Sequence, residues 1–203
     1  MAEGLRERKR RRTRQAIVEA GARLFADRGY GGTTVADIAA AAEVGTRTFF
    51  SYFASKEDLL FPESEDRIQA SVGVIRSAAP GESPAEVLAR TLDYVAGGGP
   101  DLVGPMAPLR VELARTDAAV ARVGAQFLLR AQQEMTLALA ETYADDLDPI
   151  DAAGMVGAFV GAASGTVSAM VGGTRQPDPE QLRDRLERAV ATALAGWRAQ
   201  TSK

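Results

Sequence analysis

Hydroxyl and basic side chains gather between residues 46 and 56, where their chemistry suits contact with nucleic acid. The guanidinium of Arg47 can donate two hydrogen bonds to the O6 and N7 atoms of guanine. Other members can reach phosphates or base edges through hydroxyl or ammonium groups; they are Thr46, Thr48, Ser51, Tyr52 and Lys56. These residue types and their spacing predict a DNA-reading segment.

Catalytic chemistry has a narrow basis in this sequence. The 203 residues contain no His and no Cys, which removes the commonest general base, thiol nucleophiles, disulfides and His/Cys metal sites. We therefore expect no catalytic residue, no metal site and no cofactor. An all-α enzyme that works with Asp, Glu, Lys, Tyr, Ser or Arg remains an alternative function.

The net charge of -3 conceals an uneven distribution along the chain. Residues 1–60 carry 11 basic and 8 acidic side chains, whereas residues 61–203 carry 13 and 19. Residues 1–14 alone hold seven basic side chains, and Arg11 and Arg12 lie at the centre of this run. Such a segment predicts a basic arm that contacts DNA phosphates or the minor groove; a disordered solubilising tail is the alternative.

Helical periodicity predicts an all-α fold without a convincing strand. Nine helices are expected, over residues 10–28, 35–42, 46–53, 55–78, 84–96, 108–115, 118–144, 149–171 and 179–199. Pro62 should kink or split the fourth of them. Residues 97–108 hold four Gly and three Pro, which predicts a loop.

Two short helices at 35–42 and 46–53 predict a helix-turn-helix, the arrangement in which the second helix enters the major groove. Val35, Ile38 and Ala39 would face the junction, and Phe49 and Phe53 would hold the second helix from below. The charge change near residues 55–62 predicts a helix-turn-helix domain over 10–60 and a second domain over 61–203.

One uncharged stretch, Ala152 to Val171, is long enough to cross a bilayer. It consists mostly of small residues and has no flanking Trp, Tyr or basic residues, so a helix buried between other helices is the better interpretation. No signal peptide is recognisable after the charged N-terminus. We expect a soluble, cytoplasmic protein that does not contact the membrane.

At this point the sequence resembles the tetracycline-repressor (TetR) family. The resemblance covers residues 10–60 and rests on five stretches: Ala22 to Phe25, Gly29-Tyr30, Thr33 to Ala39, Val44 to Phe53, and Ser55 to Leu59. It implies a head domain that binds double-stranded DNA as a homodimer and a helical body that binds a small molecule. The family's DNA contacts fall on Thr34, Thr46, Arg47, Thr48, Phe50, Ser51, Tyr52 and Lys56.

Three residues depart from the family pattern. Glu43 occupies a turn position that is usually Gly, and a left-handed conformation costs a non-Gly residue about 1–2 kcal/mol. Gly45 replaces the usual Ser cap and so loses a side-chain hydrogen bond. Phe50 stands where Tyr is common and lacks its hydroxyl.

A stripe of small residues predicts a dimer interface. Gly157, Gly161 and Gly165 recur every four residues, so a second helix backbone could approach this face closely. The resemblance implies that the last two helices form the dimer, with partner residues on the final helix at Leu186, Val190, Leu194 and Trp197. The alternative is that the stripe packs against another helix of its own chain.

The expected ligand pocket lies between the helices of the body. Its candidate lining residues are Met106, Leu109, Phe127, Met135 and Phe159, with Arg110 and Gln126 as polar anchors. The stretch Arg110 to Leu113, Asp117 and Asp148-Pro149 also resembles a TetR subgroup associated with acyl-coenzyme A. The resulting expectation is a repressor that binds a palindromic operator and is released by a small apolar or acyl-type effector. The alternative is a helical lipid- or metabolite-binding protein without DNA contact.

Overall fold

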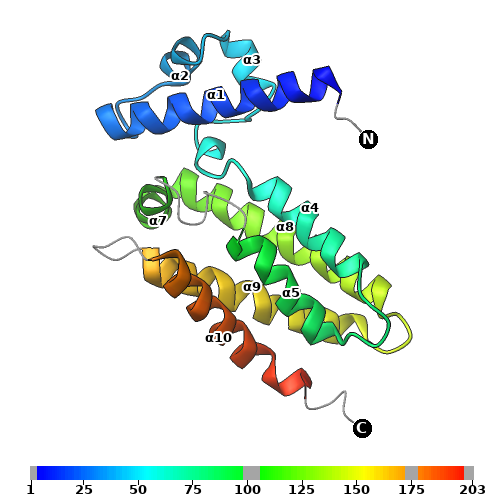
Figure 1. The fold of residues 1–203 in the computed structure, drawn as a ribbon. Coiled ribbons are helices and arrows are strands. Elements are labelled where there is room, and N and C mark those ends of the chain that lie inside the picture. Colours follow the sequence, from blue (N-terminus) through cyan, green and yellow to red (C-terminus); the bar gives the residue numbers. More distant parts are fainter. Residues whose placement is uncertain (1–3, 98–105, 172–177, 199–203) are drawn as a thin grey trace. The chain divides into compact units, whose positions relative to one another are not determined.

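The computed structural model describes residues 4–97, 106–171 and 178–198. Across these ranges the chain forms nine α-helices and one 3₁₀-helix, and no strand occurs in them, which confirms the predicted all-α fold (Figure 1). Most of the expected loop at 97–108 and the expected helix end at Gly172-Gly173 lie outside the described residues. The chain divides into two compact units, Met1–Pro62 and Glu63–Lys203, which are described separately below.

The first unit consists of α1 (Leu5–Arg28), α2 (Val35–Ala41), α3 (Thr46–Phe50) and the 3₁₀-helix η1 (Asp58–Leu60). α2 packs against α1, and α3 packs against α2. The buried apolar side chains of this unit are Ile17, Ala20, Phe25, Ile38, Ala39, Phe49, Phe53, Leu59 and Leu60. Gly21 is required where η1 meets α1, because an added Cβ would lie 2.3 Å from Leu59 Cδ2.

Several element boundaries differ from the prediction, first at α1 and at the helix expected over residues 55–78. α1 begins at Leu5 rather than at residue 10, so the basic N-terminal residues belong to the helix itself. The helix expected over 55–78 is divided into η1 and α4 (Ser64–Arg76), with Pro62 in the gap as predicted. Proline has no backbone N–H to continue a helix, which explains why the predicted helix is interrupted at this point.

The second unit contains α4, α5 (Pro84–Gly97), α7 (Ala107–Thr116), α8 (Ala118–Thr142), α9 (Pro149–Val171) and α10 (Pro179–Arg198). α9 packs against α8 on one side and α10 on the other, while α4 packs against α5 and α8 (Figure 1). Eight side chains of α9 are buried; they are Ala152, Met155, Val156, Phe159, Val160, Ala163, Val167 and Val171.

α9 contains the uncharged stretch Ala152 to Val171, which is long enough to cross a bilayer. By length and mean hydropathy it could cross a bilayer, and 33% of its most apolar window is buried within the chain. Most of its large apolar side chains belong to the same core cluster as those of α5, α8 and α10, whereas Ile150 in its first turn is exposed. The helix therefore contributes to the core of the second unit, as predicted.

Side-chain caps begin several of these helices at the positions that the sequence predicts. The carboxylate of Asp117 accepts hydrogen bonds from the backbone N–H groups of Ala119 (2.9 Å) and Val120 (3.1 Å) at the start of α8. At the start of α5, the Ser83 hydroxyl accepts from the N–H of Glu86, and the Glu86 carboxylate accepts from the N–H of Ser83. These bonds satisfy N–H groups that have no partner within the helix.

Substituting Asp117→Ala should lower the free energy of unfolding by roughly 0.5–2 kcal/mol, because the first turn of α8 loses its acceptor. Asp117→Asn keeps an acceptor oxygen and should lose much less. Chemical denaturation monitored by circular dichroism measures both. Equal losses in the two variants would contradict the capping role of this side chain.

Candidate nucleic-acid interface

A reciprocal cap begins α2. The Thr34 hydroxyl oxygen accepts a hydrogen bond from the backbone N–H of Asp37 (3.2 Å), and the Asp37 carboxylate accepts from the N–H (2.9 Å) and hydroxyl (2.5 Å) of Thr34. The bonds from the Thr34 hydroxyl and backbone hold the pKa of the Asp37 carboxyl below its usual value. Thr34, a predicted DNA contact, is therefore first of all the residue that orients the start of α2.

The turn between α2 and α3 adopts the strained conformation that the sequence predicts. Glu43 has a φ of 55°, and no other non-Gly residue of the described ranges has a positive φ. The N–H of Val44 donates to the carbonyl of Ala39 (2.9 Å), which closes the turn. α3 then starts at Thr46, and the extended backbone of Gly45 caps the helix without a side-chain bond.

Burial fixes which face of α3 points outward. Phe49 is 0% exposed and Phe53 is 4% exposed, so this side of the segment belongs to the core of the first unit. The opposite side is exposed and carries Thr46, Arg47, Thr48, Phe50 and Ser51. The five side chains predicted to face a partner therefore lie together on one accessible surface, which we call the α3 face.

α3 is shorter than predicted, because it ends at Phe50 rather than at residue 53. The chain continues as a hydrogen-bonded turn, in which the N–H groups of Tyr52 and Phe53 both donate to the carbonyl of Phe49. The Ser51 hydroxyl donates to the carbonyl of Thr48 (2.7 Å). Tyr52, another predicted contact, is half-buried beside this turn.

Lys56 has a structural role that sequence reasoning missed. Its ammonium donates to the carbonyl oxygens of Tyr30 (2.9 Å) and Thr33 (3.0 Å) and lies 4.0 Å from the centroid of the Tyr30 ring. Lys56 thereby fastens the α1–α2 connection to the segment after α3. An ammonium has three N–H donors, so these bonds still leave capacity for a phosphate.

Tyr30 makes a second connection to the same segment. Its hydroxyl donates to the Glu57 carboxylate at 2.7 Å. Burial by itself would raise the pKa of the Glu57 carboxyl, but hydrogen bonds from Tyr30, the Glu57 backbone and Ser55, together with the charge of Lys56, hold that pKa below its usual value. We refer to Tyr30, Lys56 and Glu57 as the head clasp.

The basic N-terminal residues extend α1 beyond the domain core. Arg14 donates to the carbonyl of Pro62 and its guanidinium lies 4.9 Å from the centroid of the Phe53 ring. Further towards the N-terminus, Arg6 to Arg12 are exposed, including the predicted contacts Arg11 and Arg12. In the structure, residues 5–14 are helical and continuous with α1, in place of a separate arm.

In the second unit, the predicted pocket residues do not all face the interior. Met106, Arg110, Met135 and Phe159 are buried, and Leu109 and Phe127 are half-buried. Gln126 is exposed, so the expectation that it anchors a ligand inside the body is wrong. It lies one residue before Phe127 on α8, and consecutive helix positions point about 100° apart.

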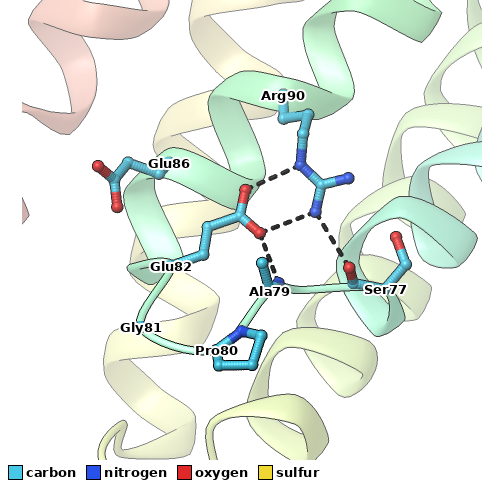
Figure 2. A pocket seen from close by; sticks show the side chains of 7 residues that line it. All are labelled: Ser77, Ala79, Pro80, Gly81, Glu82, Glu86 and Arg90. Carbon is cyan, nitrogen blue, oxygen red and sulfur yellow. Dashed lines mark hydrogen bonds and ion pairs between the residues drawn. The ribbon is translucent and has the colours of Figure 1, made fainter.

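An open hollow with a volume of about 570 Å³ lies where α4 connects to α5, and none of the predicted pocket residues line it. Figure 2 shows Glu82 and Arg90 facing each other there. Arg90 Nε donates to Glu82 Oε1 at 2.8 Å, and Arg90 Nη2 donates to Glu82 Oε2 at 2.9 Å. The hydrogen bonds and charge of Arg90 hold the pKa of the Glu82 carboxyl below its usual value. The pair fastens the connection between the two helices.

No described residue of the chain covers the glycine stripe of α9. A Cβ placed on Gly157, Gly161 or Gly165 would have no heavy atom within 4 Å among the described residues. The alternative that the stripe packs against another helix of the same chain is therefore wrong for the described part of the molecule. Trp197 of α10 contacts the neighbouring Gly154 instead, at 3.3 Å from the position of a Cβ.

The predicted contribution of α10 to the dimer needs correction. Leu186, Val190 and Leu194 are at most 1% exposed and belong to the core cluster of their own chain. They cannot contact a second molecule in this conformation, because they fill the space between α10 and its neighbours α5 and α9. Trp197 is half-buried and is the member of the predicted set that remains accessible.

Comparisons with known proteins find similar sequences for part of this chain and similar folds for most of it. Residues 17–61 match the model of a family described as bacterial regulatory proteins, tetR family. The HTH-type transcriptional regulator TcmR of Streptomyces glaucescens is 38% identical over 94 residues, a stretch that covers 46% of this chain and 42% of that protein. The matched region therefore spans less than half of the length of this curated relative.

Solved structures extend the similarity over most of the chain. A TetR-family regulator from Syntrophomonas wolfei has a TM-score of 0.62 at 20% identity and covers 90% of this chain and 95% of its own; this likeness concerns the fold alone. The TetR-family repressor FadR of Thermus thermophilus, solved in complex with lauroyl-CoA, is 25% identical with a TM-score of 0.55 and covers 90% of this chain and 94% of its own.

The head clasp makes the stability of the first unit depend on pH. The pKa of Glu57 in the folded protein is below its usual value of 4.5. The ionised Glu57 carboxylate therefore contributes to the free energy of unfolding above pH 4.5, and this contribution is lost as the pH falls through the lowered pKa. Tyr30→Phe should lower the free energy of unfolding by about 0.5–1.5 kcal/mol at pH 7.

Thermal melts of the wild type and Tyr30→Phe between pH 7 and pH 3 measure this effect. The difference between the two proteins should shrink below pH 4.5, because the protonated carboxyl is a weaker acceptor. A difference that stays constant over this range would show that the Tyr30–Glu57 bond does not depend on the ionised carboxylate.

Proposed function

We propose that the chain is a TetR-family transcriptional regulator rather than an enzyme, and that it represses transcription by binding a palindromic DNA operator as a homodimer. In this proposal the α3 face reads the major groove, and a small apolar or acyl-type effector bound in the second unit releases the DNA. The proposed location is the cytoplasm, where the DNA is.

The observation that carries the DNA-binding proposal is the composition of the α3 face. Thr46, Arg47 and Thr48 are exposed on the helix of a helix-turn-helix that enters the major groove. No ion pair to Arg47 occurs within the described residues, so its guanidinium is available for the O6 and N7 atoms of guanine. A buried Phe49 holds the helix from behind.

The basic N-terminal end of α1 supports the same proposal through a different kind of contact. Its exposed Arg and Lys side chains can neutralise phosphates and displace counterions, which strengthens binding without selecting a sequence. The remainder of the chain, residues 61–203, has six more acidic than basic side chains. Its charge opposes binding to DNA anywhere except through the head.

The proposed dimer forms through the exposed face of α9. Gly157, Gly161 and Gly165 leave this face without side chains, so the α9 helices of two molecules can approach closely. Trp197 is the accessible aromatic residue at the adjoining end of α10. A two-fold dimer presents two α3 faces, as a palindromic operator requires.

The proposed effector is a molecule with an apolar chain and an anionic head. Met106, Met135 and Phe159 supply apolar surface inside the second unit. Arg110, four residues after Met106, is a cation whose side chain is 93% buried. The likeness to the lauroyl-CoA complex of Thermus thermophilus FadR supports an acyl-type ligand. In this proposal, Arg110 meets the anionic part of the effector.

Arg47→Ala should weaken binding to the preferred DNA sequence by roughly 1–3 kcal/mol and relax selectivity at one base pair of each half-site. The preferred duplex is obtained by in vitro selection from a randomised double-stranded library, and affinities are measured by fluorescence anisotropy. Arg12→Ala is the matched control, since it should weaken all sequences alike and reduce the salt slope by about 1 for each half-site. Uniform weakening by both substitutions would contradict base reading by Arg47.

Gly161→Leu should shift the protein from dimer to monomer without loss of helix content, because leucine fits the helix and meets open space within its own chain. Gly73→Leu on α4 is the matched control, as its Cβ also meets nothing within 4 Å. Sedimentation velocity measures the dissociation constant of each. A dimer unaffected by Gly161→Leu would place the interface elsewhere.

A further inference from the structure

Phe50 is an unusual component of the α3 face, because it exposes a large apolar ring among polar side chains. It is 55% exposed, and apart from Leu5 it is the one large apolar side chain of the first unit that is exposed among the described residues. The adjacent aromatic residues Phe49 and Phe53 are buried. The exposure of Phe50 therefore does not serve the core of its own domain.

The ring of Phe50 has firm support behind it. It packs edge-on against the ring of Phe49, with 5.5 Å between the centroids and an angle of 85° between the planes. Such T-shaped aromatic pairs are favourable beyond the area that they bury. Since Phe49 is 0% exposed, Phe50 rests on an immobile base and projects from α3 beside Arg47 and Thr46.

A phenyl ring has no hydrogen-bond donor or acceptor for a phosphate or a polar base edge. The apolar group that the four base pairs offer in the major groove is the C5-methyl group of thymine. We propose that Phe50 reads this methyl group, so that each half-site requires a thymine at the position next to the base pair contacted by Arg47. This inference rests on the proposed DNA-binding function and adds a base preference to it.

The test replaces thymine by deoxyuridine, which lacks the methyl group and keeps every hydrogen-bonding atom. The probe is the duplex enriched by in vitro selection with the wild-type protein, synthesised with thymine or with deoxyuridine at single positions. For the wild type, replacing one particular thymine should lower the affinity about fourfold when it is replaced in one half-site and about sixteenfold when it is replaced in both, as expected for one and two buried methyl groups.

The Phe50→Ala variant should bind the thymine and deoxyuridine duplexes equally, and its affinity should match, within about twofold, that of the wild type for the duplex with deoxyuridine in both half-sites. Phe50→Tyr keeps the ring and should keep the preference for thymine. Arg47→Ala is the matched control: it should weaken binding to both duplexes and preserve their ratio. Circular dichroism melts check that each variant is folded.

Three results would overturn the proposal. The first is a wild-type protein that binds the thymine and deoxyuridine duplexes equally. The second is a Phe50→Ala variant whose affinity, relative to the wild type, falls by the same factor on both duplexes, which would indicate contact with the sugar or backbone. The third is a selection that enriches no sequence, which would contradict the proposed DNA-binding function as well. The first two results contradict methyl reading and leave the DNA-binding function intact.

Discussion

The burial of Phe49 is the constraint on which the DNA-reading surface depends. With its ring inside the first unit, α3 can present only one face to a partner, and this face carries Thr46, Arg47 and Phe50. The short length of α3 increases this dependence, because a helix of five residues is not stable by its own backbone hydrogen bonds. Its position is therefore a property of the domain core.

Polar contacts add to the apolar core in holding the helix-turn-helix in place. The head clasp joins the α1–α2 connection to the segment after α3 through carbonyl, carboxylate and ring contacts. Each contact is modest alone, but together they hold both ends of the helix-turn-helix in one geometry. The strained backbone at Glu43 lies in a turn that is closed by the hydrogen bond from the N–H of Val44 to the carbonyl of Ala39.

α9 connects the core of the second unit to its proposed assembly. One side of this helix contributes eight buried side chains to the core, whereas no described residue lies within 4 Å of a Cβ placed on Gly157, Gly161 or Gly165 on its other side. Both properties follow from an apolar helix whose bulky residues and glycines are separated around its circumference. The same division explains why its composition is close to that of a membrane span.

Local patterns in the sequence were sufficient to predict the all-α fold and most helix boundaries. They also predicted the caps at Thr34, Ser83 and Asp117, the split at Pro62 and the outward face of α3. Each of these depends on residues at most a few positions apart, so periodicity and capping rules predict them. The core position of Leu186 and its neighbours, the exposed amide of Gln126 and the internal bonds of Lys56 depend on which helices meet in space. Apolar spacing identifies a buried face but not the element that buries it, and that was decided by the tertiary structure.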